Sequence, residues 1–201
     1  MIKTANEIEK IATACNMVAQ TLDMIAPYVQ PGVTTEALNQ RCHDYITNTL
    51  GARPASLHYH GFPKSICTSV NHVICHGIPG DKTLKNGDIL NIDITIEHDD
   101  YHGDSARMYY VGTPSILAKR LVETTYTCLE RGIAAAQPGN TLGDIGCAIE
   151  QYAKSQNFSV VEEYCGHGKS MRPRRQNNHS LGGMVVYPST NIITPCELHK
   201  G

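Results

Sequence analysis

Two aspartates in one predicted hairpin have the placement of a metal site. Polar and isoleucine residues alternate from 91 to 96, which is the period-two pattern of a half-buried β-strand containing Asp93. Polar turn residues follow, and a second strand then contains Asp104. If the hairpin closes at 98–99, Asp93 lies directly opposite Asp104.

Carboxylates that face each other across a β-ladder repel and destabilise the pair. A divalent cation held by oxygen ligands is the simplest group that removes this repulsion. The alternative is that both are ordinary strand residues, because a turn shifted by one residue would place the two side chains on opposite faces. The metal site therefore depends on the register of the hairpin.

Two histidines are candidates for the same chemistry. His76 lies in the run VICHGIP after a strand-like segment, where a neutral imidazole can hydrogen-bond a substrate amide or transfer a proton. His167 lies between two glycines, which allow a metal ion to approach its ring closely. The alternatives are a surface histidine in the first case and a flexible turn in the second.

Composition excludes several classes of protein. The 201 residues are 41% hydrophobic and 18% charged with a net charge of −2, which is typical of a globular chain without a nucleic-acid or membrane-surface signal. No apolar run reaches the roughly 18 residues that a membrane span needs, and the N-terminus does not resemble a signal peptide. The eight cysteines are scattered without a CxxC spacing, so we expect free thiols and a cytoplasmic location.

Two helices are predicted before the hairpin. The first begins at a capping box, Thr4 with Glu7, and ends before Pro27 or in the turn that follows it. The second is capped by Thr34 or by the threonine after it, and Gly51 is its predicted stop. Strand-like segments follow at 65–70 and 73–75.

The pattern repeats at an offset of 107 residues. Pro31-Gly32-x-Thr34 matches Pro138-Gly139-x-Thr141, and several apolar positions match in the same register. Coincidence between two helix–turn–helix segments is the alternative. A duplication predicts an α+β fold with two packed halves, about 4–112 and 115–168, and a site at their junction.

Five motifs carry a resemblance to type I methionine aminopeptidases over residues 1–168. They are YHGFPKSIC (59–67), NHVICHGIP (71–79), LKNGDILNIDITI (84–96), YHGDSARMYYVG (101–112) and EEYCGHG (162–168). The resemblance implies the pita-bread fold, with a two-metal centre between duplicated halves. It also implies removal of the initiator methionine from nascent chains at the ribosome when the second residue is small.

Roles for individual residues follow from this resemblance. Asp93, Asp104 and His167 match metal ligands, with Asp104 bridging two ions of Co, Mn, Fe or Zn. His76 matches the histidine that contacts the scissile amide. The region that lines the methionine pocket is matched by Tyr59, Phe62 and Cys67, with phenylalanine at 62 where a tyrosine is common.

The chain departs from the family after residue 168. Residues 169–201 carry five basic side chains and one acidic one, show no clear period, and lack the pattern of the family's two glutamate ligands. The residues around Glu197 and His179 do not match those around the family's metal-site glutamate and second histidine. The basic run at 172–175 is typical of a solvated segment rather than of an RNA-binding one. We expect a shortened or frame-shifted product, a monomer with at most one well-bound ion and weak or no activity. The alternative is a non-catalytic pita-bread protein that binds peptides or the ribosome.

Overall fold

The computed structural model describes residues 2–161 and the backbone of 193–195. These residues form two compact units, an N-terminal unit of residues 2–114 and a C-terminal unit of residues 115–161 with 193–195. Within the described residues, no helix has the length and apolar character that a bilayer crossing requires.

The first helix, α1 (Ala5–Ile25), begins at the predicted capping box. The Thr4 hydroxyl accepts a hydrogen bond from the Glu7 N–H at 3.3 Å, and the Glu7 carboxylate accepts one from the Thr4 N–H at 2.7 Å. These bonds satisfy N–H groups that a helix leaves without partners at its start. The helix ends before Pro27, as predicted, and a 3₁₀ turn follows over Ala26–Tyr28.

The second helix, α2 (Thr35–Asp44), begins after Thr34, whose hydroxyl accepts a hydrogen bond from the Ala37 N–H at 3.2 Å. Of the two predicted caps, Thr34 is therefore the correct one. A π-helical turn (Tyr45–Thr49) continues the helix, and the chain leaves it through Gly51 at a φ of 62°. This left-handed conformation favours glycine, and the predicted stop at Gly51 is confirmed.

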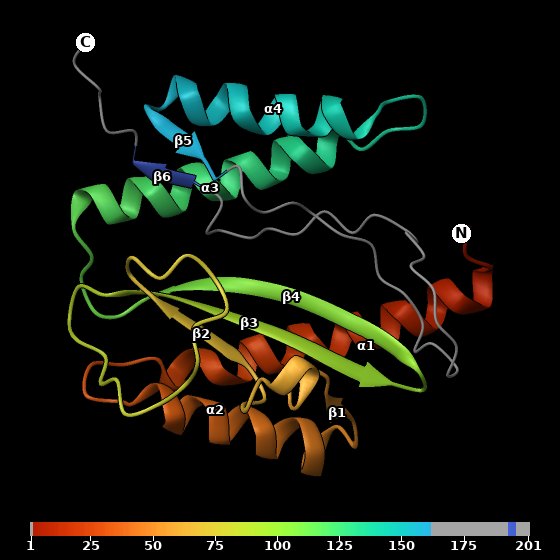
Figure 1. Cartoon of the computed structure of the whole chain (residues 1–201), viewed down its shortest axis with the longest axis vertical. Coiled ribbons are helices and arrows are strands. Elements are labelled where there is room, and N and C mark those ends of the chain that lie inside the picture. The colour runs from red at the N-terminus through yellow and green to blue at the C-terminus, as the bar shows by residue number, and fades with distance from the viewer. Residues whose placement is uncertain (1, 162–192, 196–201) are drawn as a thin grey trace. The chain divides into compact units, whose positions relative to one another are not determined.

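Four antiparallel strands form the sheet of the N-terminal unit. The central strand is β3 (Ile89–His98), which pairs along one edge with β4 (Tyr101–Tyr110). The other edge of β3 is shared by β1 (Arg53–Pro54) and β2 (Cys67–Val70). Both helices of this unit lie on one side of the sheet (Figure 1).

The prediction of a strand at 73–75 is wrong, and β2 is shorter than the predicted 65–70. Asn71 has a φ of 53°, which ends the extended conformation directly after β2. The Val73 N–H then donates a hydrogen bond to the Val70 carbonyl at 3.2 Å, which closes a turn. The chain from 71 to 79 is consequently a loop.

The predicted register of the hairpin is also wrong. The turn consists of residues 99–100, both at positive φ, which is the two-residue turn that matches the twist of antiparallel strands. Asp93 therefore pairs with Ala106, and Asp104 pairs with Thr95. Relative to the prediction the register moves by two residues, an even number, so both carboxylates stay on the same face of the sheet.

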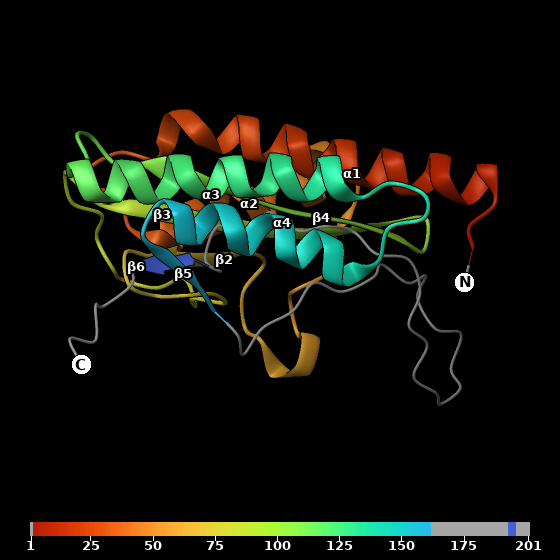
Figure 2. The same ribbon diagram turned by 90° about the horizontal axis from the view of Figure 1, so that it is seen from above.

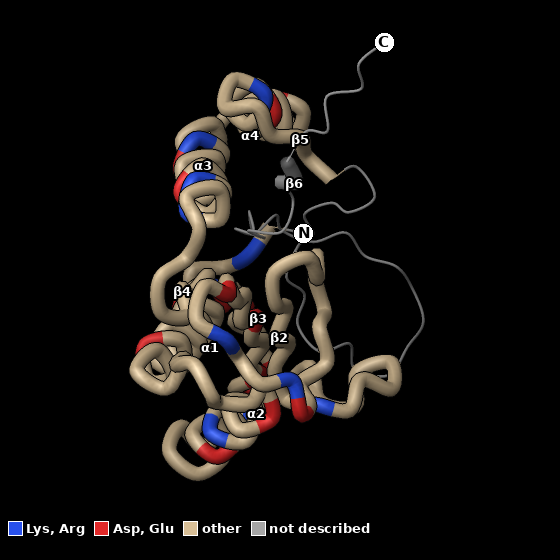
Figure 3. Tube along the Cα trace, turned by 90° about the vertical axis from the view of Figure 1, so that its left-hand side faces the viewer, with Lys and Arg blue, Asp and Glu red and all other residues tan. Residues whose placement is uncertain are grey.

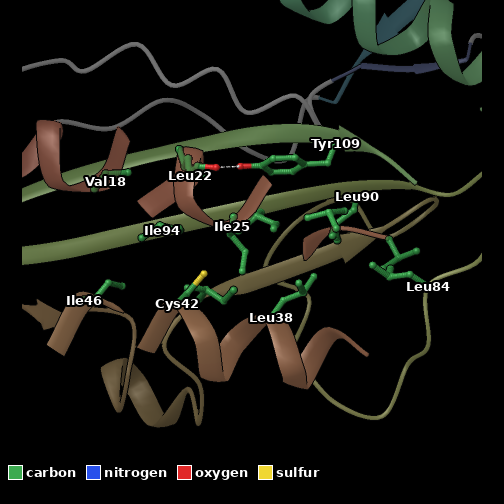
Figure 4. Close-up of a cluster of buried hydrophobic side chains, with 14 of the residues drawn as sticks. Val18, Leu22, Ile25, Leu38, Cys42, Ile46, Leu84, Leu90, Ile94 and Tyr109 are labelled. Carbon is green, nitrogen blue, oxygen red and sulfur yellow. Dashed lines mark hydrogen bonds between the residues drawn. The ribbon is translucent and has the colours of Figure 1, made fainter. Parts of the chain in front are cut away.

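The core lies between the sheet and its two helices (Figure 4). Ile92, Ile94 and Ile96 of β3 belong to this core, and because side chains alternate along a strand, Asp93 and Thr95 point to the opposite face. The Tyr109 hydroxyl in β4 donates a hydrogen bond to the Leu22 carbonyl of α1 at 2.7 Å. Buried side chains of this core include Val18, Ile25, Leu38, Cys42, Ile46, Ile92, Ile94 and Ile96.

We expect Tyr109→Phe to lower the free energy of unfolding by about 1–2 kcal/mol, because it leaves a buried carbonyl without this donor. Urea denaturation of the whole chain measures the change. The matched control is Tyr126→Phe, which removes a hydroxyl from a side chain that is 59% exposed and should change stability by less than about 0.5 kcal/mol. Equal effects of the two variants would contradict a stabilising role for the bond between α1 and β4.

The C-terminal unit is built on two helices that run side by side, α3 (Ile116–Ala135) and α4 (Leu142–Ser155) (Figure 2). A short strand, β5 (Phe158–Val160), follows and pairs antiparallel with β6 (Ile193–Pro195). At Gly132 an added Cβ would lie 3.0 Å from the side chain of Ile149, so the two helices pack closely there.

The local structure of the first helix pair recurs in the second at the offset of 107 residues. Gly32 and Gly139 both have left-handed conformations, with φ of 91° and 95°. Thr34 and Thr141 each cap the helix that follows, through hydrogen bonds from backbone N–H groups three residues later. The repeated Pro-Gly-x-Thr motif therefore codes for the same turn and helix start twice.

Candidate active site

The two candidate aspartates lie on the sheet face that points away from α1 and α2. Because Asp104 pairs with Thr95, it is the diagonal neighbour of Asp93, at positions whose separation is about 7–8 Å in an antiparallel ladder. Side chains of this length meet across such a diagonal. Acidic positions on β3 and β4 appear in red in Figure 3.

Their electrostatics shows that the two carboxyl groups interact. Burial, followed by the negative charge of Asp93, raises the pKa of Asp104 to about 8. A hydrogen bond with Thr95 acts in the opposite direction, whereas one with Asp93 raises the pKa further. Two carboxylates that cannot both ionise at neutral pH share a proton, and a divalent cation can take the place of that proton.

Cys67 belongs to the same cluster. It pairs with Asp93 across β2 and β3, and it is buried. Burial first, and then the charges of Asp93 and Asp104, raise the pKa of the Cys67 thiol to about 12. The thiol is therefore neutral near pH 7 and contributes a small apolar surface rather than a nucleophile or a metal ligand.

The other predicted substrate residues lie on the two loops that flank β2. Tyr59 begins a 3₁₀ turn (Tyr59–Gly61), is 68% exposed, and has its ring edge-on to that of His60 at 4.4 Å. Phe62 ends this turn and is half-buried. His76 is exposed on the loop after β2, with a φ of 53°.

The third predicted ligand, His167, lies outside the described residues, as do His179 and Glu197. Within residues 2–161, no set of three or more acidic, histidine or cysteine side chains is arranged to hold a metal ion. The structure thus places two of the predicted ligands, and their shared charge fits a divalent cation with oxygen ligands.

Sequence reasoning missed two groups that build this site. Thr95 hydrogen-bonds Asp104, and its place on the polar face of the alternating pattern is the signal that points to it. Asn71 donates from Nδ2 to Asp88 Oδ1 at 2.9 Å, and its Oδ1 accepts from the Ile89 N–H at 3.0 Å, which fixes the start of β3. No sequence pattern indicates that Asn71 makes these two hydrogen bonds.

Comparison with known proteins assigns the chain to a family. The sequence profile of metallopeptidase family M24 matches residues 9–188. The methionine aminopeptidase of Rickettsia prowazekii is 54% identical over 167 residues, which cover 83% of this chain and 64% of the relative. That of Salmonella typhimurium is 52% identical over 206 aligned residues, covering 100% of this chain and 78% of the relative. The sequence alignment with the Rickettsia protein thus spans somewhat less than two thirds of that relative's length.

Solved structures agree with the sequence comparison. The crystal structure of the Rickettsia prowazekii methionine aminopeptidase superposes with a TM-score of 0.82 at 48% identity, covering 92% of this chain and 78% of that one. The prolidase of Pyrococcus furiosus, at 22% identity and a TM-score of 0.74, shares the fold. The predicted α+β pita-bread architecture is confirmed, and the chain belongs to metallopeptidase family M24.

Proposed function

We propose that this chain is a metal-dependent methionine aminopeptidase that removes the N-terminal methionine from peptides with a small second residue. The placement of Asp93 and Asp104 as diagonal neighbours on one face of the sheet is the observation that carries the proposal, and the raised pKa of Asp104 is consistent with it. Relatives named methionine aminopeptidase at 52–54% identity support it. The metal is one of Co, Mn, Fe or Zn, since carboxylate and imidazole ligands suit all four.

The chain's own residues have separate tasks in this mechanism. Asp93 and Asp104 would hold the cation, with His167 as a further ligand by family resemblance. When bound, the metal supplies Lewis-acid polarisation of the scissile carbonyl and an activated water. The imidazole of His76 hydrogen-bonds the scissile amide and orients it. An apolar surface that includes Cys67 and Phe62 receives the thioether side chain of methionine.

The substrates are nascent polypeptide N-termini at the ribosome, and the protein acts as a cytoplasmic monomer. The eight cysteines of the sequence are scattered without a CxxC spacing, which supports a reducing compartment. We expect weak activity from these 201 residues by themselves, because residues 169–201 lack the pattern of the family's two glutamate ligands, one of which also serves as general base. At most one ion is held well.

Methionine release from a Met-Ala-Ser peptide tests the proposal. With Mn²⁺ or Co²⁺ we expect release that chelation abolishes, at a rate at least about a hundredfold below that of the Salmonella typhimurium relative. A Met-Leu-Ser peptide is the matched control and should not be cleaved. Release that persists with a chelator would contradict the metal mechanism, and a rate equal to that of the relative would contradict the expected weakness.

Metal stoichiometry separates this enzyme from the non-catalytic binder. After dialysis against Mn²⁺ we expect about one ion per chain by elemental analysis. Peptide binding without bound metal and without methionine release would overturn the enzymatic proposal in favour of a binding protein that retains the fold.

A further inference from the structure

The loop that carries His76 is fixed at both of its ends. At the first end, Asn71 is held by Asp88 and Ile89 through side-chain hydrogen bonds of 2.9 and 3.0 Å. The Asn71 N–H also donates to the Ile89 carbonyl at 3.0 Å. The conformation of the residues between the two ends thus depends on where the second end, Gly77, is held.

Gly77 lies directly against β2. Its carbonyl accepts a hydrogen bond from the Thr68 N–H at 2.8 Å, and its own N–H donates to Ser69 Oγ at 3.2 Å. A Cβ at position 77 would lie 2.1 Å from the Thr68 carbonyl oxygen, so only glycine allows this approach. Ser69 itself is buried, 3% exposed, and its hydroxyl is the side-chain part of this anchor.

His76 adopts a left-handed backbone conformation that is uncommon among residues with a Cβ. Its φ of 53° lies in the left-handed region, where residues with a Cβ are strained unless the surrounding structure holds them. The adjacent residue, Gly77, supplies that restraint through Ser69 and Thr68. Without the anchor, His76 can relax to an extended conformation, which would turn the imidazole to a different direction.

We propose that Ser69 is a positioning residue that holds His76 in its active conformation through the N–H of Gly77. This inference rests on the proposed function, because it assumes that the imidazole meets the scissile amide. Ser69 makes no contact with the substrate in this role. Its hydroxyl acts only on the backbone of the loop.

Ser69→Ala removes the hydroxyl that holds Gly77, and we expect kcat to fall about fivefold with little change in KM, the effect of losing one hydrogen bond. Thr68→Val is the matched control. Its hydroxyl is also buried in β2, has no hydrogen-bond partner among the described residues, and its loss leaves the backbone N–H in place. Thr68→Val should leave kcat unchanged, and Ser69→Thr should retain the wild-type value.

A double-mutant cycle decides whether Ser69 acts through His76. His76→Asn removes the imidazole with a residue that tolerates positive φ. In that background Ser69→Ala should cause no further loss of kcat. A further fivefold loss would show that Ser69 acts elsewhere, and would overturn the proposal.

The backbone ¹³Cα and ¹³Cβ chemical shifts of His76 in the metal-free protein provide a readout that needs no activity. We expect left-handed values in the wild type and in Thr68→Val, and a shift toward extended values in Ser69→Ala. Unchanged shifts in Ser69→Ala would overturn the proposal. If the wild type releases no methionine, the proposed function fails while these shifts still decide the role of Ser69.

Discussion

Asp104→Asn is expected to make the metal-free protein more stable at alkaline pH and to abolish its stabilisation by metal ions. Removing one of two interacting carboxylates relieves a like-charge contact, a gain on the order of 1 kcal/mol at pH 9. In the wild type, Mn²⁺ at a hundred times its dissociation constant should add about 2.7 kcal/mol to the free energy of unfolding, and in the variant it should add nothing. Thermal unfolding with and without Mn²⁺ measures both effects.

The difference in stability between Asp104→Asn and the wild type should change with pH in one direction. The pKa of Asp104 is raised by folding to about 8, from the value near 3.9 that an unfolded chain has. Between these values the folded state binds the additional proton, so this group stabilises the metal-free protein at low pH. That contribution is lost as the pH rises toward 8. The stability difference between Asp104→Asn and the wild type should therefore grow in favour of the variant from pH 5 to pH 9.

Asp100→Asn is the matched control for both effects. It makes the same chemical change in the same hairpin, at an exposed turn position whose positive φ suits asparagine. It should leave the response to Mn²⁺ and its pH dependence as in the wild type. If Asp104→Asn still gains stability from Mn²⁺, the carboxylate pair is not the metal site.

The sequence predicted the helices of the N-terminal unit well because their signals are local. Thr4, Thr34 and Gly51 act on hydrogen bonds within a few residues of themselves, so a capping pattern suffices to locate the ends. The hairpin register is less local. Asp99 and Asp100 both adopt positive φ, which a sequence of several polar residues does not specify, and the turn forms one residue later than predicted.

The site shows the same division between short-range patterns and tertiary contacts. The alternation that contains Asp93 placed that carboxylate on the polar face of its strand, and the register error of two residues preserved that face for Asp104. The contact between Ser69 and Gly77 joins a strand to a loop that returns to it. Nothing in the spacing of these residues indicates that contact, because it depends on how the loop folds back. The sequence context of His76 left a surface histidine as the alternative, and family resemblance assigned its role at the scissile amide.

Gly103→Ala is expected to lower the free energy of unfolding by about 3 kcal/mol, the upper part of the range for overpacking a core. A Cβ at position 103 would lie 2.3 Å from the backbone carbonyl of Ala14 in α1 and 2.4 Å from the nitrogen of Cys15. Backbone atoms cannot rotate away as a side chain can, so α1 must move off β4. Urea denaturation should show a lower midpoint.

Gly146→Ala makes the same substitution where an added Cβ meets nothing within 4 Å, in the interior of α4. Because alanine favours the helix over glycine, this control should gain up to about 1 kcal/mol. Opposite signs for one chemical change would show that the cost at Gly103 is steric. A loss of similar size at both positions would contradict that explanation.

Gly103 and Asp104 are neighbours on β4, and their substituents point to opposite faces of the sheet. We therefore expect the two substitutions to change different properties of the protein. Gly103→Ala disturbs the helix-covered face, so the protein loses stability but keeps its gain from Mn²⁺. Asp104→Asn changes the polar face, so the protein loses no stability, becomes more stable at alkaline pH, and no longer gains stability from Mn²⁺. If Gly103→Ala abolished the Mn²⁺ response in protein that still unfolds cooperatively, the metal site would depend on the packing of α1, and the two faces would not be independent.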